Sequence, residues 1–120
     1  MNEQKDDRTT VGLSQSSHAL MAQLKLEGYF EDMADCYKFA LGLAIRRGLD
    51  PIKAGNKQTY TNIGSLDKDF MIRDLMAEMY PDTGGADRPV SVIEELAEAG
   101  MQELSLMVSA GRFKISDVIA

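Results

Sequence analysis

The chain has 120 residues, 44% of them hydrophobic and 27% charged, which is typical of one globular domain rather than a disordered segment. Its net charge of -6 argues against indiscriminate binding to nucleic acid or to an anionic membrane. A single cysteine, Cys36, excludes an intramolecular disulfide and a cysteine-based zinc site.

The chain begins with a polar stretch of mixed charge, which we expect to form a flexible tail over residues 1–12. This stretch lacks the apolar segment of a signal peptide, and the longest apolar run, residues 39–45, is too short to span a bilayer. We therefore expect a cytoplasmic protein without membrane contacts. Residues 13–120 contain no repeat and no linker, and they are predicted to form a single helical domain.

Two helices are predicted in the first half of the chain. The first starts at a cluster of serines between residues 14 and 17 and stops near Gly28. The second spans about residues 31–47, because acidic residues crowd its first turns, Arg46 and Arg47 close it, and Gly48 suits the left-handed position after it. Its second half is apolar nearly all round, so we expect other elements or another subunit to surround it.

A short strand or ordered loop is predicted over residues 58–63, where threonines and Tyr60 alternate weakly with polar residues. A third helix follows, with Ser65 as its predicted N-cap. Its apolar residues recur at helical spacing and are expected to face the core. They are Ile72, Leu75, Met76 and Met79, with Phe70 in support.

The last helix is predicted to open at Pro89 and to stop at Gly111. Gly100 in its middle predicts a closely packed neighbour, since glycine is costly inside a helix. We interpret the acids near its start as a solvated face that complements the helix dipole: Glu94, Glu95 and Glu98. The apolar residues after the helix are expected to dock on the body: Phe113, Ile115, Val118 and Ile119.

Together these elements predict an all-α fold, a compact bundle of four to five helices with one short β-strand allowed near residues 58–63. Helical spacing of the apolar residues carries this prediction.

We identify no catalytic, metal or cofactor site. His18 is the only histidine and has no evident partner, and the carboxylates beside Cys36 raise a thiol pKa, so a buried structural thiol is the preferred interpretation. An unfamiliar enzyme site remains open as a third hypothesis, in a cleft lined by Tyr60, Asp67 and Asp69.

Charge is distributed unevenly along the chain. Residues 36–65 carry a net charge of +4, whereas residues 66–120 carry -6. The basic segment is predicted to contact an acidic face of a neighbouring subunit or partner, or else nucleic acid with one aromatic ring available for stacking. The candidate contact residues are Arg46, Arg47, Lys53, Lys57 and Tyr60. A ribbon-helix-helix DNA binder is a variant of the second option, because a strand at residues 58–63 precedes two helices.

The segment from Asp35 to Ala44, with an aspartate, Phe39, Ala40 and Gly42, resembles small accessory proteins of bacterial DNA phosphorothioation and related defence systems. The resemblance extends to the acidic helix from Glu94 to Leu104 and covers about half the chain. It implies an accessory role in a bacterial DNA-modification or defence system and assigns no catalytic residue.

The function expected from the sequence is therefore that of a non-enzymatic helical interaction protein, a homo-oligomer or a partner of another protein. Surplus apolar residues motivate this expectation, including eight methionines. The alternative is a nucleic-acid-binding accessory protein.

Overall fold

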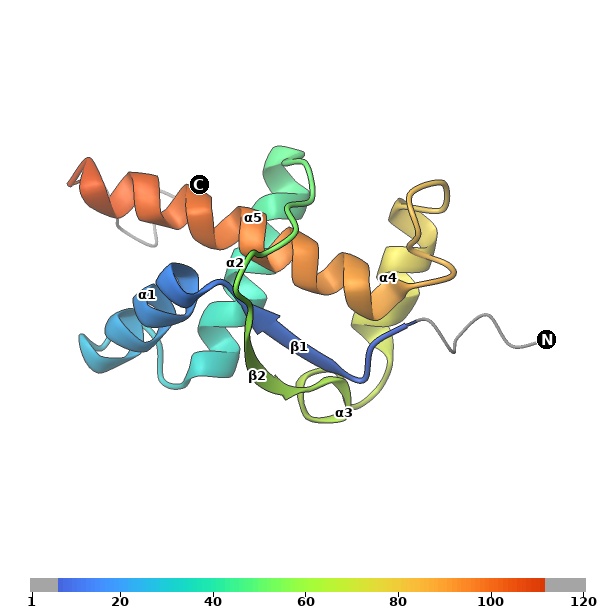
Figure 1. Ribbon diagram of the computed structural model, residues 1–120, viewed down its shortest axis with the longest axis horizontal. Helices are drawn as coiled ribbons and strands as arrows, with labels where there is room; N and C mark the ends of the chain where they lie inside the picture. The colour runs from blue at the N-terminus through green and yellow to red at the C-terminus, as the bar shows by residue number, and fades with distance from the viewer. Residues whose placement is uncertain (1–6, 112–120) are drawn as a thin grey trace.

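The longest helix, α5 (Pro89–Ser109), lies at the centre of the molecule, and the other elements pack around it (Figure 1). The computed structural model describes residues 7–111. In chain order the other elements are β1 (Thr10–Leu13), α1 (Gln15–Leu26), α2 (Met33–Arg47), β2 (Gln58–Asn62), α3 (Ile63–Leu66) and α4 (Met71–Met79). The fold is thus mostly helical with one small sheet.

Helix α5 is buried on nearly all sides because it carries apolar or small residues around its whole circumference. Residues from Val90 to Met107 contribute to the core. Gly100 confirms the prediction of a close neighbour: a Cβ atom there would overlap the carbonyl oxygen of Ala40 in α2. The two helices therefore cross at a distance that only glycine allows.

Helix α2 begins and ends close to the predicted residues. Its N-cap, Asp32, accepts a hydrogen bond from the Asp35 backbone N–H at 2.9 Å, and Gly48 adopts a left-handed conformation (φ 62°) after the last turn. The apolar side packs mainly against α5, and six of its residues are buried: Cys36, Tyr37, Ala40, Leu41, Leu43 and Ala44. Other elements of the same chain do not surround α2, since it keeps an exposed outer face, and the alternative that another subunit covers it stays a prediction.

The predicted strand near residues 58–63 is present as β2, but the all-α prediction missed its partner. Strand β1 pairs with β2 in antiparallel register, and a bulge between Val11 and Gly12 leaves Tyr60 as the extra residue. The predicted flexible tail over residues 1–12 is therefore too long. Asp7 also makes ordered contacts, because its carboxylate accepts hydrogen bonds from the Val90 and Ser91 backbone N–H groups and caps α5.

The predicted third helix is divided into two. Helix α3 ends at Leu66, and α4 starts only after Phe70, which adopts a left-handed conformation (φ 66°). The prediction of Ser65 as the N-cap is wrong. The buried carboxylate of Asp67 instead accepts hydrogen bonds from the Ile72 and Arg73 backbone N–H groups at the start of α4.

Within residues 7–111, no helix combines the length and the apolar character needed to cross a membrane. The last helix opens at Pro89 as predicted, and Gly111 follows its last turn with a positive φ. The apolar residues predicted to dock on the body lie outside the described range: Phe113, Ile115, Val118 and Ile119.

Candidate functional site

Two glutamates that we expected in solvent lie inside the protein. Glu98 is 0% exposed and Glu94 is 5% exposed, whereas Glu95 between them is half-buried. The interpretation of this cluster as a solvated face is therefore wrong for Glu94 and Glu98. Burial of an ionisable group is costly unless partners compensate it, so the partners of these two carboxylates decide their role.

Glu98 accepts four hydrogen bonds. The donors are the Ser14 backbone N–H (2.9 Å), the Ser14 hydroxyl (2.8 Å), the Ser17 hydroxyl (2.9 Å) and the Gln102 amide (2.9 Å). Burial alone would raise the Glu98 pKa, but these hydrogen bonds outweigh burial and hold the pKa below its usual value. Glu98 thus ties the start of α1 to the centre of α5.

Glu94 does the same for β1. Its carboxylate accepts a hydrogen bond from the Gly12 backbone N–H at 2.8 Å and forms ion pairs with Lys57 (3.2 Å) and Arg8 (3.6 Å). The Tyr37 hydroxyl donates to the Gly12 carbonyl at 3.2 Å. One edge of β1 therefore pairs with β2. On its other edge, the Glu94 side chain binds the backbone N–H of Gly12 and the Tyr37 side chain binds its carbonyl. The partners of both glutamates are structural contacts within the chain.

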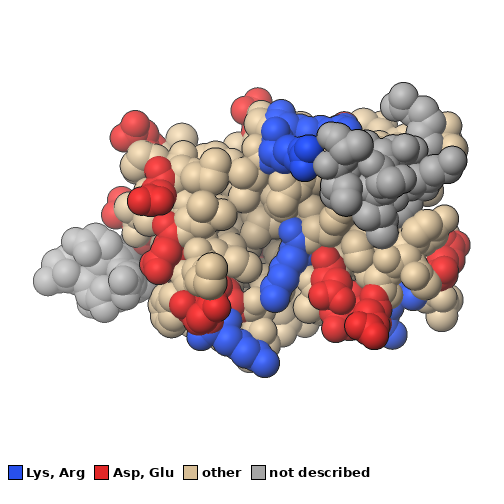
Figure 2. Space-filling view, turned by 180° about the vertical axis from the view of Figure 1, so that it is seen from behind, with Lys and Arg blue, Asp and Glu red and all other residues tan. Residues whose placement is uncertain are grey.

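The five predicted contact residues do not converge on one site. Arg47 forms an ion pair with Glu103 at 2.9 Å, and Lys57 is bound to the buried Glu94. Arg46 and Lys53 lie exposed near the end of α2 and in the loop after it. Figure 2 shows a group of Lys and Arg side chains above the middle of the molecule, near the end of α2, apart from the acidic side chains at the end that holds α4.

Tyr60, the fifth of these residues, is engaged inside the fold. Its ring stacks on Tyr37 with 5.5 Å between centroids, and His18 approaches it edge-on at 6.4 Å. Burial is the main cause that raises the Tyr60 pKa. Its strand pairs with β1 of the same chain, not with a second ribbon. Nucleic-acid stacking would therefore have to use a ring that already packs against Tyr37.

Two residues of the hypothetical cleft lined by Tyr60, Asp67 and Asp69 are engaged in contacts within the fold. Tyr60 lies on Tyr37, while Asp67 is buried beside Arg73, whose Nε lies 2.9 Å from the carboxylate. Backbone and side-chain hydrogen bonds lower the pKa of Asp67 despite the opposing effect of burial. Within residues 7–111, no three side chains of the kinds that bind metals gather into a possible metal site.

Cys36 fits the interpretation as a structural thiol. It is fully buried, and its Sγ lies 4.0 Å from the sulfur of Met101 in α5. Burial raises the pKa of the Cys36 thiol to about 12. A thiol that stays protonated at neutral pH is a poor nucleophile.

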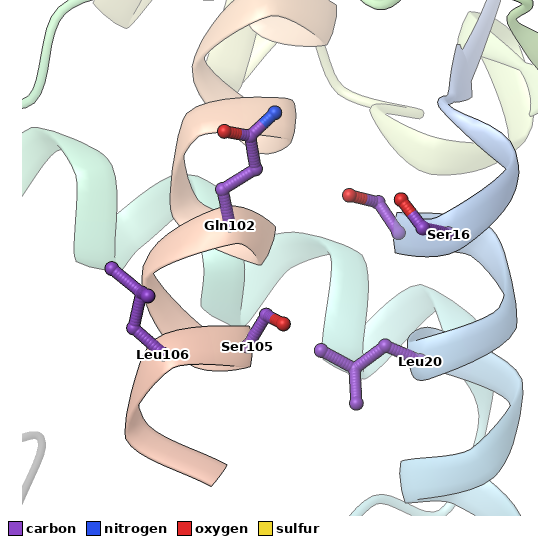
Figure 3. A pocket seen from close by; sticks show the side chains of 6 residues that line it. Ser16, Leu20, Gln102, Ser105 and Leu106 are labelled. Atoms are coloured by element: carbon purple, nitrogen blue, oxygen red, sulfur yellow. The ribbon is translucent and has the colours of Figure 1, made fainter. Parts of the chain in front are cut away.

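Two hollows in the described surface are lined by side chains that already make hydrogen bonds or ion pairs within the chain. A hollow of about 280 Å³ lies between α1 and α5 (Figure 3), where Ser17 and Gln102 already donate to Glu98. A larger hollow of about 400 Å³ lies beside α4, where Arg8 and Arg73 are already paired with Glu94 and Asp67. Neither hollow presents a constellation that indicates a reaction.

The feature that stands out is an uncovered apolar face on α4. Met71, Leu75 and Met79 recur every four residues along the helix and are 68%, 41% and 48% exposed. Phe70 adjoins them at the start of the helix and is 55% exposed, and the guanidinium of Arg73 lies over its ring, 3.3 Å from the centroid. We call these four residues the α4 apolar face. Asp74 and Glu78 lie beside it and line the same shallow hollow as Met71 and Leu75.

The predicted stripe contained three residues of this face, Phe70, Leu75 and Met79, but it also contained Ile72 and Met76 and was expected to face the core. Only Met76 of α4 is buried, because α4 packs on α5 through one narrow side. Surplus apolar surface therefore lies on α4 and not on α2, where we expected it. The many apolar and small residues of α5 were the one hint that its glutamates are buried, since a helix of this composition is typical of the centre of a fold.

Comparisons with known proteins give no further guide to this surface. No family model, no curated protein and no solved structure matches the chain.

Proposed function

We propose that this chain is a non-enzymatic helical interaction protein that self-associates. The observation that carries the proposal is the α4 apolar face, since a monomer rarely leaves a continuous stripe of large apolar side chains in water. Methionine side chains at two of the four positions adapt well to a partner's surface.

The size of the face is compatible with a measurable contact. Full burial of a Met, Leu or Phe side chain contributes roughly 1.5–3 kcal/mol. The exposed parts of these four side chains amount to about two full side chains, or roughly 3–6 kcal/mol, and the surface buried on the partner adds to this toward the roughly 8 kcal/mol of a micromolar complex, before the entropic cost of association is subtracted. We therefore expect reversible association at micromolar concentration rather than a permanent complex.

Sedimentation velocity across micromolar concentrations tests this proposal. We expect the wild type to show a concentration-dependent increase in mass and Leu75→Asp to sediment as a single chain. Leu106→Asp is the matched control, because Leu106 is an exposed leucine on α5, away from α4. A wild type that stays monomeric throughout would contradict the proposal.

The cellular role of the chain is inferred from the sequence resemblance alone. We propose an accessory role in a bacterial DNA-modification or defence system, in which the chain assembles with itself or with another protein. A pull-down from a bacterial host that carries such a system, with wild type and Leu75→Asp as parallel baits, tests this setting. Retention of its components by wild type alone would support the role.

Nucleic-acid binding is the second candidate, and the exposed cations near the end of α2 are the observation that favours it. Binding of this kind weakens steeply as salt rises. A gel shift at low salt with duplex DNA and with RNA tests it, and Arg46→Glu with Lys53→Glu should abolish any shift. Absence of retained nucleic acid at low salt would end this candidate.

A further inference from the structure

The exposed side of α2 offers a surface that matches the α4 apolar face. Lys38, Gly42 and Arg46 are exposed at positions four residues apart, and half-buried Phe39 and Ile45 flank the glycine. Nothing lies within 4 Å of the point where a Cβ of Gly42 would be. We call these five residues the α2 outer face: it is open at its centre, apolar at its flanks and carries a cation on each side of the glycine, with the exposed Asp35 one turn before Lys38.

The two faces carry opposite charges. The α4 apolar face is bordered by Asp74 and Glu78, one turn apart, and the α2 outer face carries Lys38 and Arg46, two turns apart. In a contact between the two faces, Asp74 and Glu78 beside the α4 apolar face would lie near Lys38 and Arg46 of the α2 outer face. Complementary charges at the rim of a contact set its orientation and partner choice.

The two faces cannot meet within one molecule. Helices α2 and α4 both pack on α5, but α2 crosses its middle whereas α4 lies beside its first turns (Figure 1). A contact of α4 with α4 of a second copy is also disfavoured. In an antiparallel pair about a two-fold axis at Leu75, Asp74 and Glu78 of both copies would lie on the same side, where like charges repel.

We propose that the α4 apolar face of one copy docks on the α2 outer face of the next, which gives a head-to-tail, salt-sensitive assembly. This inference rests on the proposed self-association and names the two surfaces that form it. A contact between two different faces is heterologous, so it propagates into a ring or an open chain.

A mixing experiment distinguishes this assembly from a symmetric dimer. Leu75→Asp removes the α4 face, and Lys38→Glu with Arg46→Glu removes the α2 face. We expect each variant alone to have the mass of one chain in light scattering after gel filtration. An equal mixture should form a complex of two chains and nothing larger, because one intact face of each kind remains.

A charge exchange provides the second test. Asp74→Lys with Glu78→Lys should abolish assembly alone and restore it when mixed with Lys38→Glu/Arg46→Glu, and raising the salt concentration should dissociate the wild type. Circular dichroism should be unchanged throughout, since every substituted side chain is exposed on the folded chain.

The outcomes separate the two proposals. If the wild type associates but Lys38→Glu/Arg46→Glu associates equally well, α4 contacts another surface and the head-to-tail inference is wrong, while self-association stands. If the mixture of single-face variants stays monomeric although the wild type associates, the inference is also overturned. A monomeric wild type overturns both.

Discussion

Replacing Glu98 by glutamine tests the claim that a buried carboxylate joins α1 to α5. The substitution keeps the shape of the side chain but turns one acceptor oxygen into a donor. Four donors point at the carboxylate, and one of its oxygens accepts only the Ser14 backbone N–H. A glutamine keeps the Ser14 N–H satisfied only if its amide nitrogen faces the Ser14 and Ser17 hydroxyls, because hydroxyls can rotate to accept but a backbone N–H cannot.

The magnitude follows from these contacts. All of these hydrogen bonds lose the strengthening that a charged acceptor gives them, and a donor left facing the new amide nitrogen costs about 1–3 kcal/mol. The neutral glutamine also avoids the cost of burying a charge, and this gain offsets part of the loss. We expect Glu98→Gln to lower the free energy of unfolding by about 2–4 kcal/mol, a large share of the roughly 5–15 kcal/mol of an ordinary domain.

Urea denaturation followed by circular dichroism measures this change. At a slope of about 1–3 kcal/mol per molar urea, the midpoint should fall by roughly 1–2 M. Glu95→Gln is the matched control on the same helix: its half-buried side chain should tolerate the substitution with little change. Equal stability of Glu98→Gln and Glu95→Gln would refute the assigned role.

The pH dependence gives an independent check. The folded-state pKa of Glu98 lies below its unfolded value. Its stabilising contribution is therefore fully present above the unfolded pKa and is lost as pH falls through the folded pKa. The stability difference between wild type and Glu98→Gln should shrink over that acidic range, and a difference that stays constant would contradict the assignment.

Two further predictions concern the packing of α2 on α5. Gly100→Ala should destabilise the fold by about 2–4 kcal/mol in urea denaturation, because its Cβ would overlap the Ala40 carbonyl. Gly42→Ala lies on the open face of α2 and should stabilise the fold by about 0.5–1 kcal/mol, because alanine favours a helix more than glycine does. Cys36 should react with a thiol reagent at neutral pH only after unfolding, since burial raises its pKa to about 12; rapid reaction in the native state would contradict its burial.

Local signals in the sequence were sufficient for the two long helices. Pro89 marked the opening of α5, and Gly48 marked the end of α2, because capping and the helix dipole act within one turn. Gly100 even indicated a long-range contact, since glycine inside a helix needs a packing reason. These features depend on neighbouring residues and can be recognised without the rest of the chain.

Strand β1 and the buried glutamates could not be found in the same way. Four residues of β1 carry too little alternation to identify a strand, and its second edge is satisfied by Glu94, 82 residues away from Gly12. The dipole of α5 explains acids near its start equally well in solvent. Only the position of α5 at the centre of the fold decides that Glu94 and Glu98 face inward.

The charge segregation seen along the chain has a consequence for recognition. Two cations of the basic segment, Arg47 and Lys57, neutralise acids of α5 within the same molecule, so they contribute little to an outside partner. Asp74 and Glu78 lie instead on the exposed side of α4, beside the apolar stripe. A partner that contacts these two acids therefore meets them together with apolar side chains, and that combination selects a cationic, open protein surface rather than a polyanion.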